Sequence, residues 1–231
     1  MREAAPRVLD VAPERLAGWI SSFAERHGGK LAVEAGADTV VFLAGDGAEA
    51  RCQVPFPPFA RADGAPAAVA GKLAEHACAD RTIGVLLVRR GGYAAGVFTG
   101  TGPTLAASKV GSRLVHGRSA AGGQSQQRFA RRRENQARQA MAAAADTAAA
   151  VFGPFTLDAL VLGGDRRALA SVRNDMRLAP FFERAVERFL TVPDPRLTVL
   201  QATPRLFRAI RIMLTEPDGQ AGRAHASGPR A

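Results

Sequence analysis

The chain has 231 residues, is 47 % hydrophobic and carries a formal net charge of +10, which allows one large domain or two small ones. It contains no apolar run long enough to span a bilayer and does not start like a secretory signal, so we expect a cytoplasmic protein with no membrane partner. The two cysteines, Cys52 and Cys78, form no CxxC pair, which argues against a disulfide framework or a zinc site.

The first 79 residues predict a small N-terminal α+β lobe. Apolar residues at positions i, i+3, i+4 and i+7 after Pro13 predict an amphipathic helix. Two strand-like runs on either side of Gly45-Asp46-Gly47 predict a hairpin. The proline-rich segment 55–59 interrupts regular structure. The elements expected in this lobe are a helix over 13–27, strands over 39–44 and 48–54, and a helix over 66–78.

Residues 80–216 predict a second domain. Its pattern indicates three antiparallel strands, one long helix, and then alternating strands and helices, which is the order of an RNase H-like α/β domain. We therefore expect a mixed α/β (α+β) protein with an RNase H-like core and, over 217–231, a disordered tail. The expected strands cover 82–88, 93–100, 108–115, 157–162 and 189–192, and the expected helices cover 125–152, a segment ending near 184, and 203–216.

Positive charge is concentrated between Lys109 and Arg138, a segment in which Glu134 is the only acid. Arginine forks match phosphate geometry, so an RNA backbone is the expected partner of this segment. The basic residues are Lys109, Arg113, Arg118, Arg128, Arg131, Arg132, Arg133 and Arg138, of which Arg128, Arg131, Arg132 and Arg138 share overlapping faces at helical spacings. The expected buried stripe on the opposite face is Phe129, Met141, Ala144, Ala148 and Phe152.

Most charge runs on helices are solvated faces, and this is the alternative interpretation of the arginine segment. A solvated face normally mixes both signs of charge, so the scarcity of acids favours binding to a polyanion.

The tripeptide Gly122-Gly123-Gln124 comes directly before this basic helix. Two residues without a Cβ let the main chain approach a partner closely. Gln124 offers a backbone N–H and an uncharged amide, which can orient a water molecule and donate hydrogen bonds to developing charge. The tripeptide is not a phosphate-binding P-loop, because no Lys-Ser/Thr pair follows it. By itself it also suits a flexible surface loop.

The longer stretch GRSAAGGQSQQRFARRRENQ resembles the loop and following helix of the middle domain of eukaryotic class-one peptide release factors. In that family a GGQS sequence precedes an RFARxR helix. Here Gly122 to Ser125 match the first part, and Arg128 to Arg131 with Arg133 match the second. The resemblance implies an RNase H-like core. The whole chain is similar to a narrower group, the stand-alone actinobacterial relatives of Vms-type ribosome quality-control hydrolases, described as Vms-like release factors or peptidyl-tRNA hydrolases.

This resemblance implies that Gly122, Gly123 and Gln124 enter the peptidyl transferase centre of the large (50S) ribosomal subunit and hydrolyse the ester of peptidyl-tRNA. The chemistry requires no metal and no cofactor. Ribosomal RNA and tRNA phosphates are the expected partners of the arginines, and we expect a monomer. The residues that would hold these phosphates are Arg113, Arg118, Arg128, Arg131, Arg132 and Arg133. Because the segment before residue 80 is short for a codon-reading domain, we expect rescue of stalled large subunits rather than termination at stop codons.

Two alternatives remain from the sequence. An RNase H-like fold also serves metal-dependent nucleases, which hold two ions with clustered carboxylates. Against this, strand 82–88 carries no acid, and Asp158 and Asp165 have no evident partner. The second alternative is a non-catalytic RNA- or ribosome-binding module, which has the same arginines and gives the tripeptide no role.

Overall fold

The structure is a computed structural model that describes residues 6–89, 92–112 and 124–217, with only the backbone described for 124–134. The chain divides into two compact units. The first unit comprises the part up to Ala79 together with the part from Arg208 onward, and the second comprises Asp80–Phe207. The chain therefore passes between the units twice.

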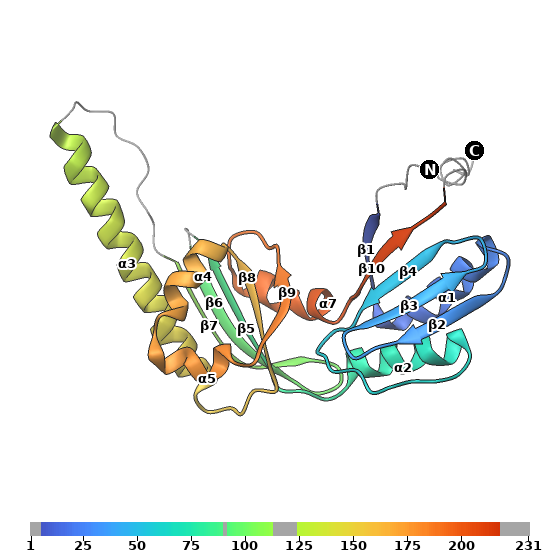
Figure 1. Cartoon of the computed structure of the whole chain (residues 1–231). Coiled ribbons are helices and arrows are strands. Elements are labelled where there is room, and N and C mark those ends of the chain that lie inside the picture. The colour runs from blue at the N-terminus through green and yellow to red at the C-terminus, as the bar shows by residue number, and fades with distance from the viewer. Residues whose placement is uncertain (1–5, 90–91, 113–123, 218–231) are drawn as a thin grey trace, which may run out of the picture. The chain divides into compact units, whose positions relative to one another are not determined.

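The first unit is built on a five-stranded sheet in the order β1-β10-β4-β3-β2 (Figure 1). Every neighbouring pair in this sheet is antiparallel. The Gly-Asp-Gly turn joins β3 to β4 as a hairpin, as the sequence predicted. The strands are β1 (Arg7–Val11), β2 (Leu31–Ala35), β3 (Thr39–Ala44), β4 (Glu49–Gln53) and β10 (Ile210–Thr215).

Helices α1 (Pro13–Arg26) and α2 (Pro66–Cys78) cover one face of this sheet, and both agree with the predicted helices. Each begins with proline at its first helical position, where the missing N–H costs nothing. Their apolar stripes pack on alternate residues of the strands, so the core lies between the two layers. Cys52 of β4 is free and fully buried in this core, and burial raises the pKa of its thiol to about 12.

The predicted helix over 203–216 is wrong. A single turn, α7 (Thr203–Phe207), ends the second unit, and the chain then becomes β10. Strand β10 lies between β1 and β4 and so belongs to the first unit, which corrects the predicted end of the second domain at 216. Strands β1 and β2 were not predicted either. The predicted tail lies almost wholly outside the described residues.

The second unit has a five-stranded sheet in the order β7-β6-β5-β8-β9. The first three strands along the chain are antiparallel neighbours, and β8 and β9 continue the sheet parallel to β5. This is the arrangement predicted for an RNase H-like core, so the predicted fold class is confirmed. The strands are β5 (Ile83–Arg89), β6 (Gly92–Thr99), β7 (Thr104–Ser112), β8 (Ala159–Gly164) and β9 (Ala185–Leu190).

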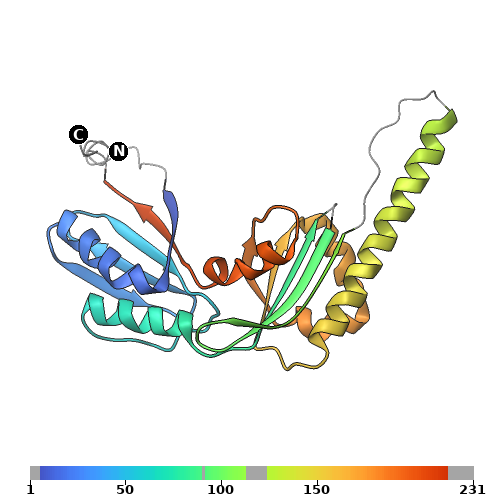
Figure 2. The same cartoon turned by 180° about the vertical axis from the view of Figure 1, so that it is seen from behind.

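Helices lie on both faces of this sheet (Figures 1 and 2). On one face, α3 (Gln124–Phe152), α4 (Arg166–Arg173) and α5 (Ala179–Phe182) form a core with β5, β6 and β8. On the other face, α6 (Leu197–Gln201) and α7 pack against the side chains of β6 that point away from this core. There the ring centroids of Phe98 and Phe207 lie 5.9 Å apart.

Several boundaries in the second unit differ from the prediction. Strand β7 begins four residues before the predicted strand over 108–115 and ends three residues before its end, and β8 is shifted by two residues from the predicted 157–162. The helix predicted to end near residue 184 is interrupted, because Asp165 caps α4 and Asp175 caps a separate 3-10 turn at Met176–Leu178. Strand β9 begins at Ala185, four residues before the predicted start at 189, and ends at Leu190, two residues before the predicted end. None of the helices in the described part of the chain has the length and hydropathy needed to cross a bilayer.

Candidate nucleic-acid interface

The long helix α3 is the element that carries most of the predicted site. Its 29 residues correspond to about 43 Å at the usual helical rise. Its C-terminal part is packed: Ala144 and Ala148 are fully buried, and Phe152 stacks edge-on against Phe181 with ring centroids 5.5 Å apart. In both views the first turns of α3 extend beyond the sheet of the second unit (Figures 1 and 2). The packed end therefore anchors a projecting end.

The predicted stripe on α3 is confirmed for the part that the structure describes. Ala144, Ala148 and Phe152 are buried, and Met141 packs against them while half-buried. The side chain of Phe129 lies outside the description. The contacts of this stripe are with β5, β6, β7 and α4. Small alanines at these positions allow the helix to lie close to the sheet.

The structure brings five of the predicted site residues into the first three turns of α3. Gln124 is the first residue of the helix. The arginines follow at spacings that repeat the helical period, although their side chains are outside the description. Arg133 lies seven residues before buried Ala140, so it falls on the line of the packed stripe rather than on the face shared by the others. The four arginines are Arg128, Arg131, Arg132 and Arg133.

The remaining predicted site residues, Gly122, Gly123, Arg113 and Arg118, lie outside the described residues. They belong to the connection between β7 and α3, and the sequence places the two glycines directly before Gln124.

The first part of α3 whose side chains are described, residues 135–139, is exposed throughout. Arg138 donates a hydrogen bond from Nη2 to Oδ1 of Asn135 at 3.0 Å, one turn away on the same helix. These five positions of α3 are therefore accessible to a partner.

Arg177 ties the packed end of α3 to the 3-10 turn. Its Nη2 donates to Asp146 of α3 at 2.7 Å and to Asp175 at 2.6 Å. The hydrogen bonds from Arg177 hold the pKa of the Asp175 carboxyl below its usual range, and the two carboxylates raise the pKa of Arg177. All three side chains are in contact with solvent, so each ion pair contributes little to stability. No local pattern predicts this contact, because Asp146 and Arg177 are 31 positions apart.

The net positive charge of the chain comes entirely from the second unit. The sequence from Asp80 to Phe207 holds 19 of the 31 basic residues and nine of the 21 acidic ones, so the rest of the chain holds 12 of each. A net charge restricted to one unit is a stronger indication of a polyanionic partner than a basic composition spread over the chain.

The two acids considered for a nuclease site have structural roles. Asp158 Oδ2 accepts a hydrogen bond from the backbone N–H of Thr82 at 2.8 Å, at the start of β5. Asp165 accepts from the backbone N–H groups of Arg167 and Ala168 as the cap of α4. Among the residues that the structure describes, no three His, Cys, Asp or Glu side chains come together as a metal site would require.

Comparison with known protein families assigns the chain. The family model for the Actinobacteria/chloroflexi VLRF1 release factor matches residues 81–213, which is more than half of the chain. The chain belongs to this VLRF1 release factor family. Family membership supports a release-factor-like role in translation. The matched region covers the second unit and extends into β10 of the first.

Solved structures give only distant likenesses to this VLRF1-family chain. An archaeal translation termination factor, aRF1, is 12 % identical over 69 % of this chain, with a TM-score of 0.38, and the match spans 47 % of that factor. The Vms1 mitochondrial localization core is 8 % identical over 75 % of each chain, with a TM-score of 0.37. These likenesses are too distant to add to the family assignment. No curated protein matches the chain.

Proposed function

We propose that this protein is a peptidyl-tRNA hydrolase that rescues stalled large ribosomal subunits. In this proposal the tip formed by Gly122, Gly123 and Gln124 enters the peptidyl transferase centre and promotes attack of water on the ester that joins the nascent peptide to tRNA. The release factor family of the chain and the restriction of its charge to the second unit support the proposal.

The observation that carries the proposal is the position of Gln124 as the first residue of α3. The first N–H groups of a helix have no acceptor within the helix, and they lie at the positive end of its dipole. A backbone N–H at this position is therefore available to an outside oxygen that gains negative charge.

The reaction breaks the bond between the peptide carbonyl carbon and the 3′-oxygen of the terminal adenosine. Water adds to the carbonyl carbon, the 3′-oxygen leaves with the bonding electrons, and a proton from the water ends on that oxygen. The Gln124 N–H would stabilise the leaving oxygen, and the Gln124 side chain would limit which water reaches the carbon. The two preceding glycines would allow the main chain to approach the ester without a Cβ in the way.

The arginines of α3 have a separate role in the proposal, which is to hold RNA phosphates. Replacing Arg128, Arg131 or Arg132 with Gln should weaken binding to 50S subunits and lower the salt dependence of binding by about one unit of slope for each lost phosphate contact. Arg15→Gln is the matched control, because Arg15 is exposed on α1 of the electrically neutral first unit. Equal effects of the control and the α3 variants would show that total charge, and not the arginines of α3, drives binding.

Gln124→Ala tests the chemical role against the alternative of a non-catalytic ribosome-binding module. Purified 50S subunits that carry labelled peptidyl-tRNA are mixed with wild type or variant at concentrations that saturate binding. The proposal predicts equal binding and a release rate reduced by about 100-fold in the variant, because alanine keeps the backbone N–H but lacks the side chain that would select and place the water. Equal release by both proteins would remove the Gln124 side chain from the chemistry, and no release by wild type while bound would support the binding module.

A further inference from the structure

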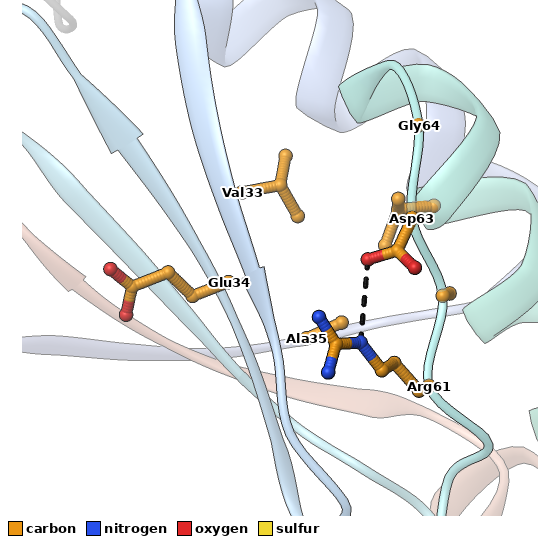
Figure 3. A pocket seen from close by; sticks show the side chains of 8 residues that line it. Val33, Glu34, Ala35, Arg61, Asp63 and Gly64 are labelled. Carbon is orange, nitrogen blue, oxygen red and sulfur yellow. Dashed lines mark ion pairs between the residues drawn. The ribbon is translucent and has the colours of Figure 1, made fainter.

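The first unit has a free sheet edge with a groove beside it, and no function of this edge follows from release activity. Strand β2 is the last strand of its sheet, so among the residues that the structure describes one side of its backbone has no partner strand. A groove with a volume of about 410 Å³ lies between β2 and the segment from Arg61 to Gly64, which leads into α2 (Figure 3). Val69 of α2 lines its inner side.

The register of β2 shows which backbone groups face outward. The N–H of Gly36 donates to the carbonyl of Thr39 at 2.9 Å, which closes the β2–β3 hairpin. Hydrogen-bonded pairs alternate along an antiparallel ladder, so Glu34 is paired inward with Val41. By the same alternation, the N–H and C=O groups of Val33 and Ala35 point to the free edge. Within the described residues, the backbone of 60–64 forms no hydrogen bond with them.

The side chains along this edge separate into two faces. Val33 and Ala35 are half-buried on the core side, beside the groove, whereas Glu34 points to the opposite face of the sheet (Figure 3). Arg61 and Asp63 form an ion pair of 3.6 Å at the rim of the groove, and their side chains are 85 % and 83 % exposed. A pair this exposed contributes little and can open without much cost.

We propose that the β2 edge binds an extended peptide segment of a partner protein, which adds a sixth strand to the sheet of the first unit. Main-chain hydrogen bonds to Val33 and Ala35 would provide affinity, and the side chains of alternate peptide residues would provide specificity. Residues opposite Val33 and Ala35 must be small and apolar to enter the groove. The residue opposite Glu34 must be Lys or Arg, because opposite charges across strands attract.

Charge favours a peptide over the other occupants of such an edge. The first unit holds equal numbers of acidic and basic residues, and the groove is bordered by Glu34 and by the Arg61–Asp63 ion pair, so the site has no excess of positive charge to attract a nucleic acid. A second copy of β2 would bring two Glu34 carboxylates onto one face of the joined strands, where like charges repel. The short strand and its central charge also protect the edge against indiscriminate pairing.

A phage-displayed random heptapeptide library, panned on the full chain, tests the proposal without ribosomes. The expected result is enrichment of peptides with an apolar–basic–apolar core. In synthetic versions of the enriched peptides, N-methylation of the residues opposite Val33 and Ala35 should weaken binding at least about tenfold, while N-methylation of the intervening residues should have little effect. A library without enrichment, or binding that shows no period of two, would overturn the proposal.

Substitutions locate the binding at β2. Glu34→Lys should weaken binding of the enriched peptides by about threefold to tenfold. Glu75→Lys, the same charge reversal at an exposed position of α2 away from the groove, should not. Val33→Pro removes an outward N–H without breaking the ladder to β3, so it should abolish binding. Because Val33 also packs against the core of the first unit, Val33→Ala, which keeps the N–H, is the control for lost packing and should still bind the peptides. If Glu34→Lys and Glu75→Lys act equally, or if light scattering shows a dimer that Val33→Pro dissociates, the edge does not bind peptides as proposed.

Discussion

Phe152→Ala should strongly destabilise the second unit, because Phe152 anchors the packed end of α3. Its side chain is 1 % exposed, and its ring meets that of Phe181 at 5.5 Å and 63°. Truncating a buried phenylalanine costs about 3–5 kcal/mol of the free energy of unfolding. This is a large share of the about 5–15 kcal/mol that stabilises a typical domain. The expected fall in melting temperature is about 6–20 °C.

Far-UV circular dichroism is the suitable assay for Phe152→Ala, because the only tryptophan of the chain, Trp19, lies in α1 of the first unit. Urea titrations of wild type, Phe152→Ala, Phe181→Ala and the double variant give the coupling between the two rings. We expect about 0.5–1.5 kcal/mol for an edge-on aromatic pair.

The matched control for Phe152→Ala is Arg138→Ala, at an exposed position of the same helix, which should stay within about 0.5 kcal/mol of wild type. A loss below about 1 kcal/mol for Phe152→Ala would refute the inference that α3 is held at this end. A loss as large in Arg138→Ala would refute it as well, because the anchor would then not be specific to the packed stripe.

Three other substitutions test the structure at separate points. Gly164→Ala should destabilise the protein, because Gly164 has a φ of +101° and an added Cβ would collide with a backbone carbonyl of β5; thermal melts should show the loss. Gly71→Ala, inside α2 with no atom within 4 Å of the added Cβ, should instead stabilise by about 0.5–1 kcal/mol. The hydrogen bond from buried His27 lowers the pKa of Asp46, so ionised Asp46 stabilises the fold above its usual pKa, and this contribution is lost as the pH falls through the lower folded-state value. Asp46→Asn should therefore show a flatter dependence of melting temperature on pH below about pH 4 than wild type, and equal slopes would contradict this account.

Elements with a local signal could be predicted from the sequence. The helical periods of α1, α2 and α3 and the Gly-Asp-Gly turn between β3 and β4 specify their structures within a few residues. The order of strands and helices along the second unit, up to β9, followed from the succession of these signals. The candidate RNA-binding part of α3 was also evident, because a run of arginines with almost no acids occurs only once in the chain.

Elements defined by distant partners could not be predicted. The apolar residues of β10 alternate at Ile210, Ile212 and Leu214, but Leu206, Ile210 and Met213 also fit a helical period. The strand is decided by its pairing with β1 and β4, which lie more than 150 residues earlier in the chain. The ion pair of Arg177 with Asp146 also depends on tertiary structure, as does the groove beside β2. No local sequence pattern indicates either of them.

The central claim is that the protein hydrolyses the peptidyl-tRNA ester at the Gln124 tip. The most direct measurement is single-turnover release from 50S subunits carrying labelled peptidyl-tRNA in water enriched in oxygen-18. The account predicts that wild type releases a peptide with one oxygen-18 in its new carboxylate, that the tRNA keeps an intact terminal adenosine, and that Gln124→Ala binds equally well but releases about 100-fold more slowly. A released peptide that still carries RNA would indicate a nuclease, and the absence of release by bound wild type would contradict the claim.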